Sequence, residues 1–193
     1  SPNFIGAWRL DNLELCAAII DFFEDQSPAH RVGETLSGVE KEIKNSTDLS
    51  INPKELKNPS HLPLAAYIDG LFECYQDYLE QWPFLATILP EIDIGQFNVQ
   101  KYGIGDHFAG VHSERVSLES AHRIFAWMTY LNEVDSGEQT HFNHYDLSVA
   151  PECGKTLIWP AEWTHAHSGK VVTSGVKYII TGWMHFPHHP KRS

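Results

Sequence analysis

The chain changes character after residue 90, and this change limits the possible folds more than any other feature of the sequence. Short β-rich runs follow one another, and clusters of Gly, Pro, Asp and Asn such as DSGE, APECG and SGKVVTSG separate them. The runs are GQFNVQKY, HRIFAWMTYLN, DLSVA, KTLIW and KYIITGWMHF. Several short strands with turn signals between them predict an antiparallel sandwich or jelly roll.

The first 90 residues predict helices that pack against this β core. Asp11 and Glu14 have the spacing of a capping box, and the apolar run LCAAIIDFF follows them. From Leu64 onward apolar residues recur at intervals of three and four, which predicts an amphipathic helix ending before Pro83. Residues 26–62 are rich in Ser, Asn, Pro and charge, and predict irregular loop with edge strands.

We therefore expect one domain with three parts. These are a helical support and irregular loop region (1–90), a jelly-roll core (91–187) and a tail (188–193). A length of 193 residues with 42% apolar residues suits a single buried core. The histidine-rich end HFPHHPKRS is interpreted as a solvated tail, because its prolines prevent regular ligand spacing.

Charge and cysteine content argue against several functions. A formal net charge of −11, with 14 Lys and Arg residues and no basic run, does not suit binding to nucleic acid or to an anionic membrane. Cys16, Cys74 and Cys153 lie far apart without C-x-x-C spacing, so the sequence indicates a reducing, cytoplasmic setting. No apolar run approaches the roughly 18 residues that a bilayer requires, and no leader pattern is visible in SPNFIGAW. We expect a soluble chain that is not exported.

Two His-x-carboxylate triplets are candidate metal sites. They are His112-Ser113-Glu114 and His144-Tyr145-Asp146. On a strand, residues i and i+2 point to the same face, so each triplet offers two ligands together. A third ligand must come from elsewhere, and WTHAHSG supplies His165 and His167. Two His and one carboxylate leave open positions on an iron(II) ion for a co-substrate and dioxygen.

A lysine and a tyrosine are each ten residues away in sequence from a candidate histidine ligand. Lys177 follows His167 by ten residues and lies in the β-rich run SGVKYIITGW. A lysine buried among apolar neighbours needs a fixed anion. Tyr102 precedes His112 by ten residues, and its phenol can donate a hydrogen bond to the same anion.

In this order the motifs resemble the iron(II)- and 2-oxoglutarate-dependent dioxygenases, and among them the prolyl 4-hydroxylase-like branch. The resemblance runs from about Phe97 to Phe186. Each motif alone is a weak signal, and the ordered set is a strong one. The elements are Tyr102 and Gly105 leading into His112 and Glu114; Arg123 before Tyr130-Leu131-Asn132; Gly137, Glu138, Thr140 and Phe142; Pro151 and Gly154; then His167, Gly169 and Lys177.

The resemblance implies a mostly β fold, a double-stranded β-helix (jelly roll) core with N-terminal support helices. It implies that His112, Glu114 and His167 bind Fe(II), that Lys177 pairs with the distal carboxylate of 2-oxoglutarate, and that Tyr102 hydrogen-bonds it. Thr140 would contact the same co-substrate. The implied reaction hydroxylates a C–H bond with O2 and releases succinate and CO2, with ascorbate as an optional addition. The substrate could be peptidyl proline, another side chain or a small metabolite.

Several alternatives remain at this point. Glu114 stands where the family pattern has Asp, which adds a methylene to the carboxylate ligand. His144 with Asp146, and His165 in place of His167, are rival ligands, although Lys177 and Gly169 favour His167. A catalytically silent jelly-roll module that binds a metal or keto acid is the alternative function, and a zinc hydrolase would leave Lys177 unexplained.

Four further residues have structural interpretations. Trp127, Trp159 and Trp183 lie in strand-like runs and are expected in the core. Arg123 lies in an apolar strand and is expected to have a buried partner such as a carboxylate.

Overall fold

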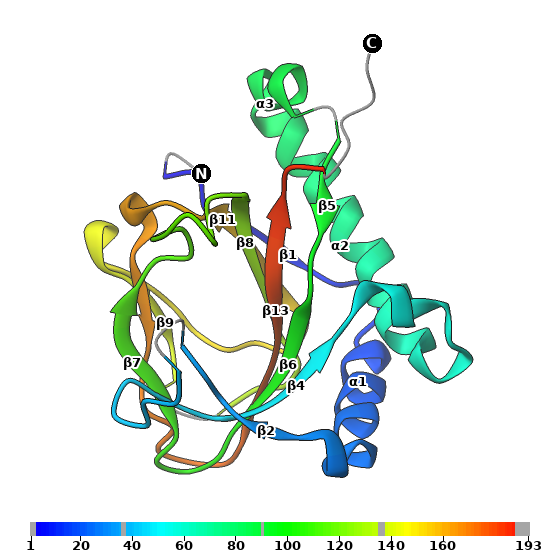
Figure 1. Cartoon of the computed structure of the whole chain (residues 1–193), viewed down its shortest axis with the longest axis vertical. Helices are drawn as coiled ribbons and strands as arrows, with labels where there is room; N and C mark the ends of the chain where they lie inside the picture. The colour runs from blue at the N-terminus through cyan, green and yellow to red at the C-terminus, as the bar shows by residue number, and fades with distance from the viewer. Residues whose placement is uncertain (1–2, 36–37, 90, 135–137, 188–193) are drawn as a thin grey trace.

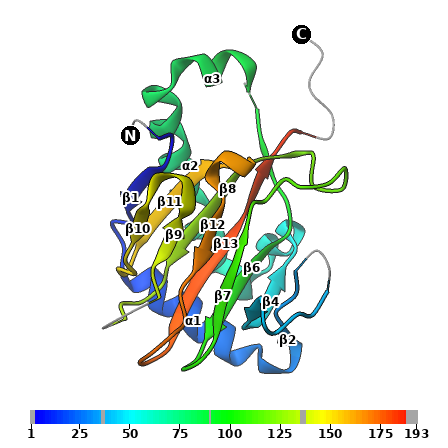
Figure 2. The same cartoon turned by 90° about the vertical axis from the view of Figure 1, so that its left-hand side faces the viewer.

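The computed structural model describes residues 3–35, 38–89, 91–134 and 138–187. In it the β-rich runs form two antiparallel sheets that face each other, as Figures 1 and 2 show. The larger, the major sheet, has eight strands in the order β1-β11-β8-β13-β6-β4-β2, with β5 paired to β13. The minor sheet has five, in the order β10-β9-β12-β7-β3. This is the expected jelly roll.

The strand bounds show which part of the chain supplies each sheet. Edge strands in both sheets come from the first 90 residues, including β1, which the sequence pattern did not predict. The major-sheet strands are β1 (Gly6–Arg9), β2 (Arg31–Val32), β4 (Thr47–Ile51), β5 (Asp93–Ile94), β6 (Phe97–Tyr102), β8 (Arg123–Tyr130), β11 (Lys155–Pro160) and β13 (Lys177–His185). The minor-sheet strands are β3 (Lys44–Asn45), β7 (His107–His112), β9 (Thr140–Phe142), β10 (Leu147–Val149) and β12 (His167–Gly169).

Two long helices cover the face of the major sheet that points away from the minor sheet (Figure 1). They are α1 (Glu14–Asp25) and α2 (Leu62–Gln81), and the short α3 (Pro83–Ile88) follows α2. The expected capping box is wrong, because the backbone amide of Glu14 donates a hydrogen bond to Asn12 Oδ1, at 3.1 Å, and not to Asp11. The second expected helix is confirmed as α2, which ends before Pro83. None of the helices in the described residues is long and apolar enough to cross a membrane.

Strand β8 separates two apolar layers and shows why its sequence is a continuous apolar run. Phe125 and Trp127 point into the layer between the helices and the major sheet. Ala126, Met128 and Tyr130 alternate with them and point into the layer between the two sheets. A strand buried on both faces carries apolar residues at every position rather than at every second one. The candidate ligands line this second, inter-sheet space.

Several features named from the sequence fall outside the described residues. These are residue 90 at the expected boundary, most of the DSGE turn (135–137, with Gly137), and the tail at 188–193. The crossing between the sheets near the cavity is fully described. There the chain leaves the minor sheet after β3 and joins the major sheet at β4, with only Ser46 between the two strands.

Candidate metal centre and its cavity

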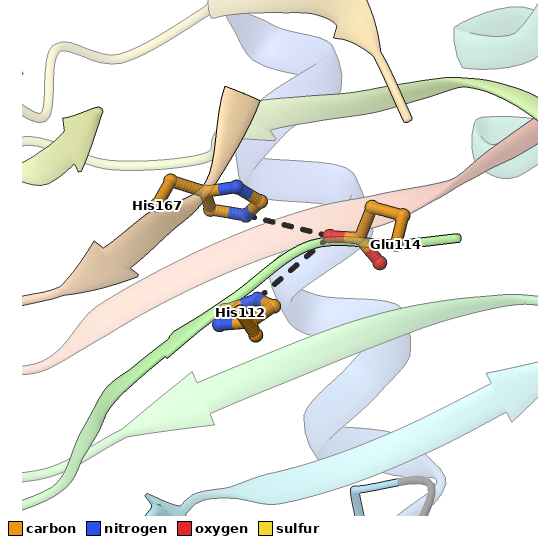
Figure 3. Close-up of side chains that lie close together, drawn as sticks. All are labelled: His112, Glu114 and His167. Carbon is orange, nitrogen blue, oxygen red and sulfur yellow. Dashed lines mark ion pairs between the residues drawn. The ribbon is translucent and has the colours of Figure 1, made fainter. Parts of the chain in front are cut away.

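Three side chains far apart in the sequence converge between the sheets. His112 is the last residue of β7, Glu114 follows it by two positions, and His167 begins β12, where it pairs with His112. Figure 3 shows both imidazole rings directed at the Glu114 carboxylate. The Nε2 atom of His112 lies 3.7 Å and that of His167 3.4 Å from the same oxygen, Glu114 Oε1. In the described residues this is the one group of three or more potential ligands close enough to share a metal ion.

Backbone carbonyls fix the tautomer of both imidazoles. Nδ1 of His112 lies 2.8 Å from the carbonyl oxygen of Gly110, and Nδ1 of His167 lies 2.9 Å from that of His165. A carbonyl oxygen only accepts, so each Nδ1 must carry a proton and donate it. In a neutral imidazole the remaining lone pair is then on Nε2. Both lone pairs therefore face Glu114.

The pKa values of His112 and Glu114 both shift in the folded protein. Burial and the neighbouring His167 ring lower the pKa of His112 to about 4. Burial alone would raise the pKa of Glu114, but His167, His112 and Trp183 outweigh it and lower this pKa to about 2. At neutral pH His112 is uncharged and Glu114 is ionised.

The donor set fits a divalent metal ion. In their neutral forms the two imidazoles place both Nε2 lone pairs beside the Glu114 carboxylate, an arrangement that a cation satisfies. Two His and one carboxylate form the facial set that suits iron(II) with open positions. The two Nε2 atoms and Glu114 Oε1 are the atoms that would hold such an ion.

Trp183 and Arg123 hold the Glu114 segment in place. The indole Nε1 of Trp183 donates to Glu114 Oε2 at 2.7 Å, which leaves Oε1 facing the histidines. The Arg123 guanidinium stacks 3.7 Å from the Trp183 ring centre and donates to the backbone oxygen of Glu114 at 3.0 Å. Trp183 therefore lines the cavity instead of lying in the core, and the side chain of Arg123 meets an indole and a backbone carbonyl instead of a carboxylate. Trp127 and Trp159 are buried as expected.

Replacing Trp183 by Phe is expected to weaken Mn(II) binding by about tenfold, because hydrogen bonds to a ligand from outside the metal sphere tune its orientation and basicity. Isothermal titration of metal-free protein measures this. Trp159→Phe is the matched control, since the Trp159 ring lies 5.0 Å from His167 but its Nε1 has no hydrogen-bond partner. Equal affinities of the two variants would contradict the role of the indole.

A cavity of about 650 Å³ connects the ligands with the other expected site residues, Tyr102, Thr140 and Lys177. Lys177 begins β13 and pairs with Tyr102 at the end of β6. Its ammonium lies 4.5 Å from the centre of the Tyr102 ring, and burial lowers its pKa to about 8 although Glu138 acts in the opposite direction. Of the carboxylates in the described residues, none forms an ion pair with Lys177.

The hydroxyl groups at this end of the cavity are already hydrogen-bonded. Tyr102 donates to Oε1 of Gln100 at 2.9 Å. The Thr140 hydroxyl lies 2.6 Å from that of Tyr130. Lys44 and Asp48 also line this cavity and form an ion pair at 2.7 Å. Sequence reasoning missed Lys44, Asp48 and Gln100, although Gln100 stands on the inward face of β6 with Tyr102, a signal that alternation could have revealed.

The rival ligands lie elsewhere. Nε2 of His165 is 2.8 Å from the backbone oxygen of Asn3, so this ring fastens the N-terminal segment. His144 lies in a short 3-10 turn against the exposed Trp163, and Asp146 has a left-handed backbone with φ 47°. That triplet is not on a strand and its two side chains do not share a strand face.

Comparison with known proteins gives a family match. Residues 97–185 match the model of the 2OG-Fe(II) oxygenase superfamily. Probable prolyl 4-hydroxylase 9 of Arabidopsis thaliana is 25% identical over 134 residues, 56% of this chain and 46% of the relative. Human prolyl 4-hydroxylase subunit alpha-3 is 29% identical over 101 residues, 45% of this chain and 19% of the relative. The chain thus spans less than half the length of these relatives.

Solved structures agree on the fold. A Pseudomonas putida prolyl-4-hydroxylase has a TM-score of 0.73 at 14% identity, covering 95% of this chain and 94% of its own. A Trichoplax adhaerens prolyl hydroxylase, in complex with a peptide fragment of the hypoxia inducible factor oxygen degradation domain, has a TM-score of 0.71 at 15% identity, covering 95% and 84%. Residues 97–185 are thus similar to the 2OG-Fe(II) oxygenase superfamily, and the sequence relatives named above are prolyl 4-hydroxylases.

Proposed function

We propose that the chain is an iron(II)- and 2-oxoglutarate-dependent dioxygenase that hydroxylates a C–H bond and releases succinate and CO2. The observation that carries this proposal is the meeting, in one cavity, of the His112, Glu114 and His167 side chains and a buried ammonium that forms no ion pair with a carboxylate of the described residues. A metal site alone would not need Lys177. A dicarboxylate co-substrate that chelates the metal needs both the metal ligands and a cation for its distal carboxylate.

The residues at one end of the cavity would bind the metal, and those at the other end would bind the co-substrate. His112, Glu114 and His167 would hold Fe(II), which supplies with 2-oxoglutarate and O2 the oxidising chemistry of the reaction. Lys177 would pair with the distal carboxylate of 2-oxoglutarate, since a buried ammonium gains most from a fixed anion. Thr140 lines the same end and would contact the co-substrate through its hydroxyl. Trp183 and Arg123 keep the Glu114 carboxylate oriented.

We propose a peptide as the substrate, hydroxylated on a prolyl or another side chain. The sequence relatives are prolyl 4-hydroxylases, and the Trichoplax relative is a complex with a peptide fragment. Exposed apolar side chains at Val32, Val111 and Val116 line the cavity and suit contact with a peptide. A cytoplasmic setting and the absence of nucleic-acid partners stay predictions.

The proposal is tested without a substrate by adding Fe(II) and 2-oxoglutarate to metal-free protein under anaerobic conditions. We expect the weak visible charge-transfer band of a keto acid chelated to iron(II). His112→Ala and His167→Ala should abolish the band because each removes one of the three metal ligands. His144→Ala should keep it, because His144 belongs to the rival triplet and lies outside the cavity.

Two outcomes would contradict the proposal. If metal binds and no band forms, the cavity does not take a keto acid. The band could also form without any succinate appearing after oxygen is added, whether or not a candidate peptide is present. In that case the silent binding module is the better description.

A further inference from the structure

The backbone that carries Glu114 is fixed on both sides of this residue. On one side His112 ends β7 and pairs with His167 across the minor sheet. On the other side the amide of Arg115 donates to the backbone oxygen of Ala161 at 3.0 Å. A shift of the Glu114 backbone toward either histidine would therefore break a backbone contact.

Two arginine side chains strengthen this anchoring. The Arg115 guanidinium forms an ion pair with Glu162, and the Arg123 guanidinium donates to the backbone oxygen of Glu114 at 3.0 Å. Glu162 lies in the connection between β11 and β12, which leads directly to His167. The segment that carries Glu114 is thus fastened to the segment that carries the second histidine.

The Glu114 side chain spans the space between this fixed backbone and three partners. Its Oε1 lies 3.7 Å from Nε2 of His112 and 3.4 Å from Nε2 of His167 (Figure 3). Its Oε2 accepts from Nε1 of Trp183 at 2.7 Å. Backbone carbonyls hold both imidazoles, and the indole stands on β13, inside the major sheet. The length of the carboxylate side chain therefore decides whether all three contacts form together.

One methylene makes the difference in this length. An aspartate at the same backbone position would withdraw the carboxylate by about 1.5 Å, the length of one C–C bond. This is more than the spread of about 0.5 Å within which N–H···O distances normally fall. A carboxylate withdrawn so far can stay with the indole or stay beside the imidazoles, and it cannot do both.

We propose that the contacts of Arg115, Arg123 and Trp183 hold Glu114 at a distance that only a glutamate spans, so that an aspartate placed here would bind the metal more weakly. This inference rests on the metal ligands of the proposed function. The three residues are positioning residues, because they act through Glu114. The departure from the aspartate of the family pattern is then a requirement of the surroundings of Glu114.

The test is a double-mutant cycle on metal binding. Metal-free protein is titrated with Mn(II) by calorimetry in four forms: wild type, Glu114→Asp, Trp183→Phe and the double variant. Glu114→Asp should weaken binding about 100-fold, but only about tenfold once Trp183 is replaced, because the shorter carboxylate then has no indole to satisfy. Trp183→Phe should weaken binding no further when Glu114 is already replaced by Asp.

Hydrogen exchange of the Trp183 indole proton gives a second readout, which a general loss of packing would not move in this way. The Trp183→Phe variant identifies its NMR signal among those of the six tryptophans. In wild type loaded with diamagnetic Zn(II), this proton should exchange as slowly as in metal-free protein, because Glu114 keeps both contacts. In Glu114→Asp, Zn(II) should speed its exchange about tenfold or more, because the carboxylate leaves the indole for the metal.

Two control variants separate the length of the side chain from its charge and its place. Glu114→Gln keeps the length and an acceptor for the indole, so it should weaken Mn(II) binding but leave the indole proton protected. Glu24→Asp shortens a glutamate that also accepts two hydrogen bonds, from Lys101 and Tyr178, and that does not line the cavity. It should change Mn(II) affinity less than about twofold.

Each result decides one question. Mn(II) affinity in Glu114→Asp equal to that of wild type overturns the inference and leaves the proposed function intact. Equal costs of Glu114→Asp with and without the indole overturn it as well. If Glu114→Asp does not fold, the wild type decides: faster exchange of its indole proton on Zn(II) loading would mean that Glu114 cannot serve both partners either. Wild-type protein that binds neither ion overturns the proposed function, and the inference with it.

Discussion

Lys177→Met is expected to weaken 2-oxoglutarate binding by about 100-fold or more, because it removes a buried charge partner of the distal carboxylate. Metal binding should be unchanged, since Lys177 contacts none of the three ligands. The same variant should make ligand-free protein more stable by roughly 1–3 kcal/mol at pH 7, because a buried ammonium that forms no ion pair with a carboxylate of the described residues opposes folding. Loss of function and gain of stability would therefore occur together.

The gain in unfolding free energy expected for Lys177→Met depends on pH, because the pKa of Lys177 is lowered in the folded protein. The pKa of Lys177 falls from 10.5 to about 8 on folding, so the unfolded chain holds the proton more tightly. Below pH 8 both states are protonated and the full penalty is present. Between pH 8 and 10.5 the penalty fades, and stability of the wild type rises relative to Lys177→Met.

Calorimetric titration and urea unfolding at several pH values measure both effects. Lys170→Met is the control, because Lys170 is an exposed lysine at the end of β12 and should alter neither quantity. Full 2-oxoglutarate affinity in Lys177→Met would contradict the assignment of this lysine.

Trp127→Ala is expected to lower the free energy of unfolding by about 3–5 kcal/mol, the cost of emptying a large core site. Trp127 is fully buried, and its ring centre lies 5.8 Å from those of Tyr67 on α2 and Phe97 on β6. It joins the helical layer to the sheet that carries Lys177. The indole also covers Gly182, where a Cβ would come within 2.6 Å of it.

Denaturant unfolding checks this prediction, with Trp163→Ala as the matched control. Trp163 is 67% exposed, so its removal should cost less than about 0.5 kcal/mol. Similar losses in the two variants would show that Trp127 does not connect the layers.

The sequence was sufficient to predict that His112, Glu114 and His167 lie together, because short spacings encode much of this arrangement locally. His112 and Glu114 are two residues apart, and Lys177 follows His167 at a distance that fixes its place on the next strand. Periodicity also predicted α2, whose buried face repeats at three and four.

Contacts between distant parts of the chain could not be predicted in this way. Trp183 and Glu114 are separated by 69 positions, and Gln100 and Asp48 by 52, so no local pattern links them. Residues 26–62 were expected to be irregular loop with edge strands, and the structure has β2, β3 and β4 there. The pairings of β2 and β3 could not be predicted, because strands of two residues leave almost no periodic signal. Strand β1 was missed because it has only four residues and its partner β11 lies about 150 positions further along the chain, for example Ile158 opposite Gly6.

The one-residue crossing at Ser46 limits how the two sheets can move apart. β3 pairs with β7, which carries His112, and β4 pairs with β6, which carries Tyr102. Because a single residue joins β3 to β4, the sheets cannot separate at this edge without breaking one of these pairings. Any widening of the sandwich must be greatest at the opposite edge, near β1 and β10. The crossing therefore ties β7, which carries His112, to β6, which carries Tyr102, on this side of the cavity.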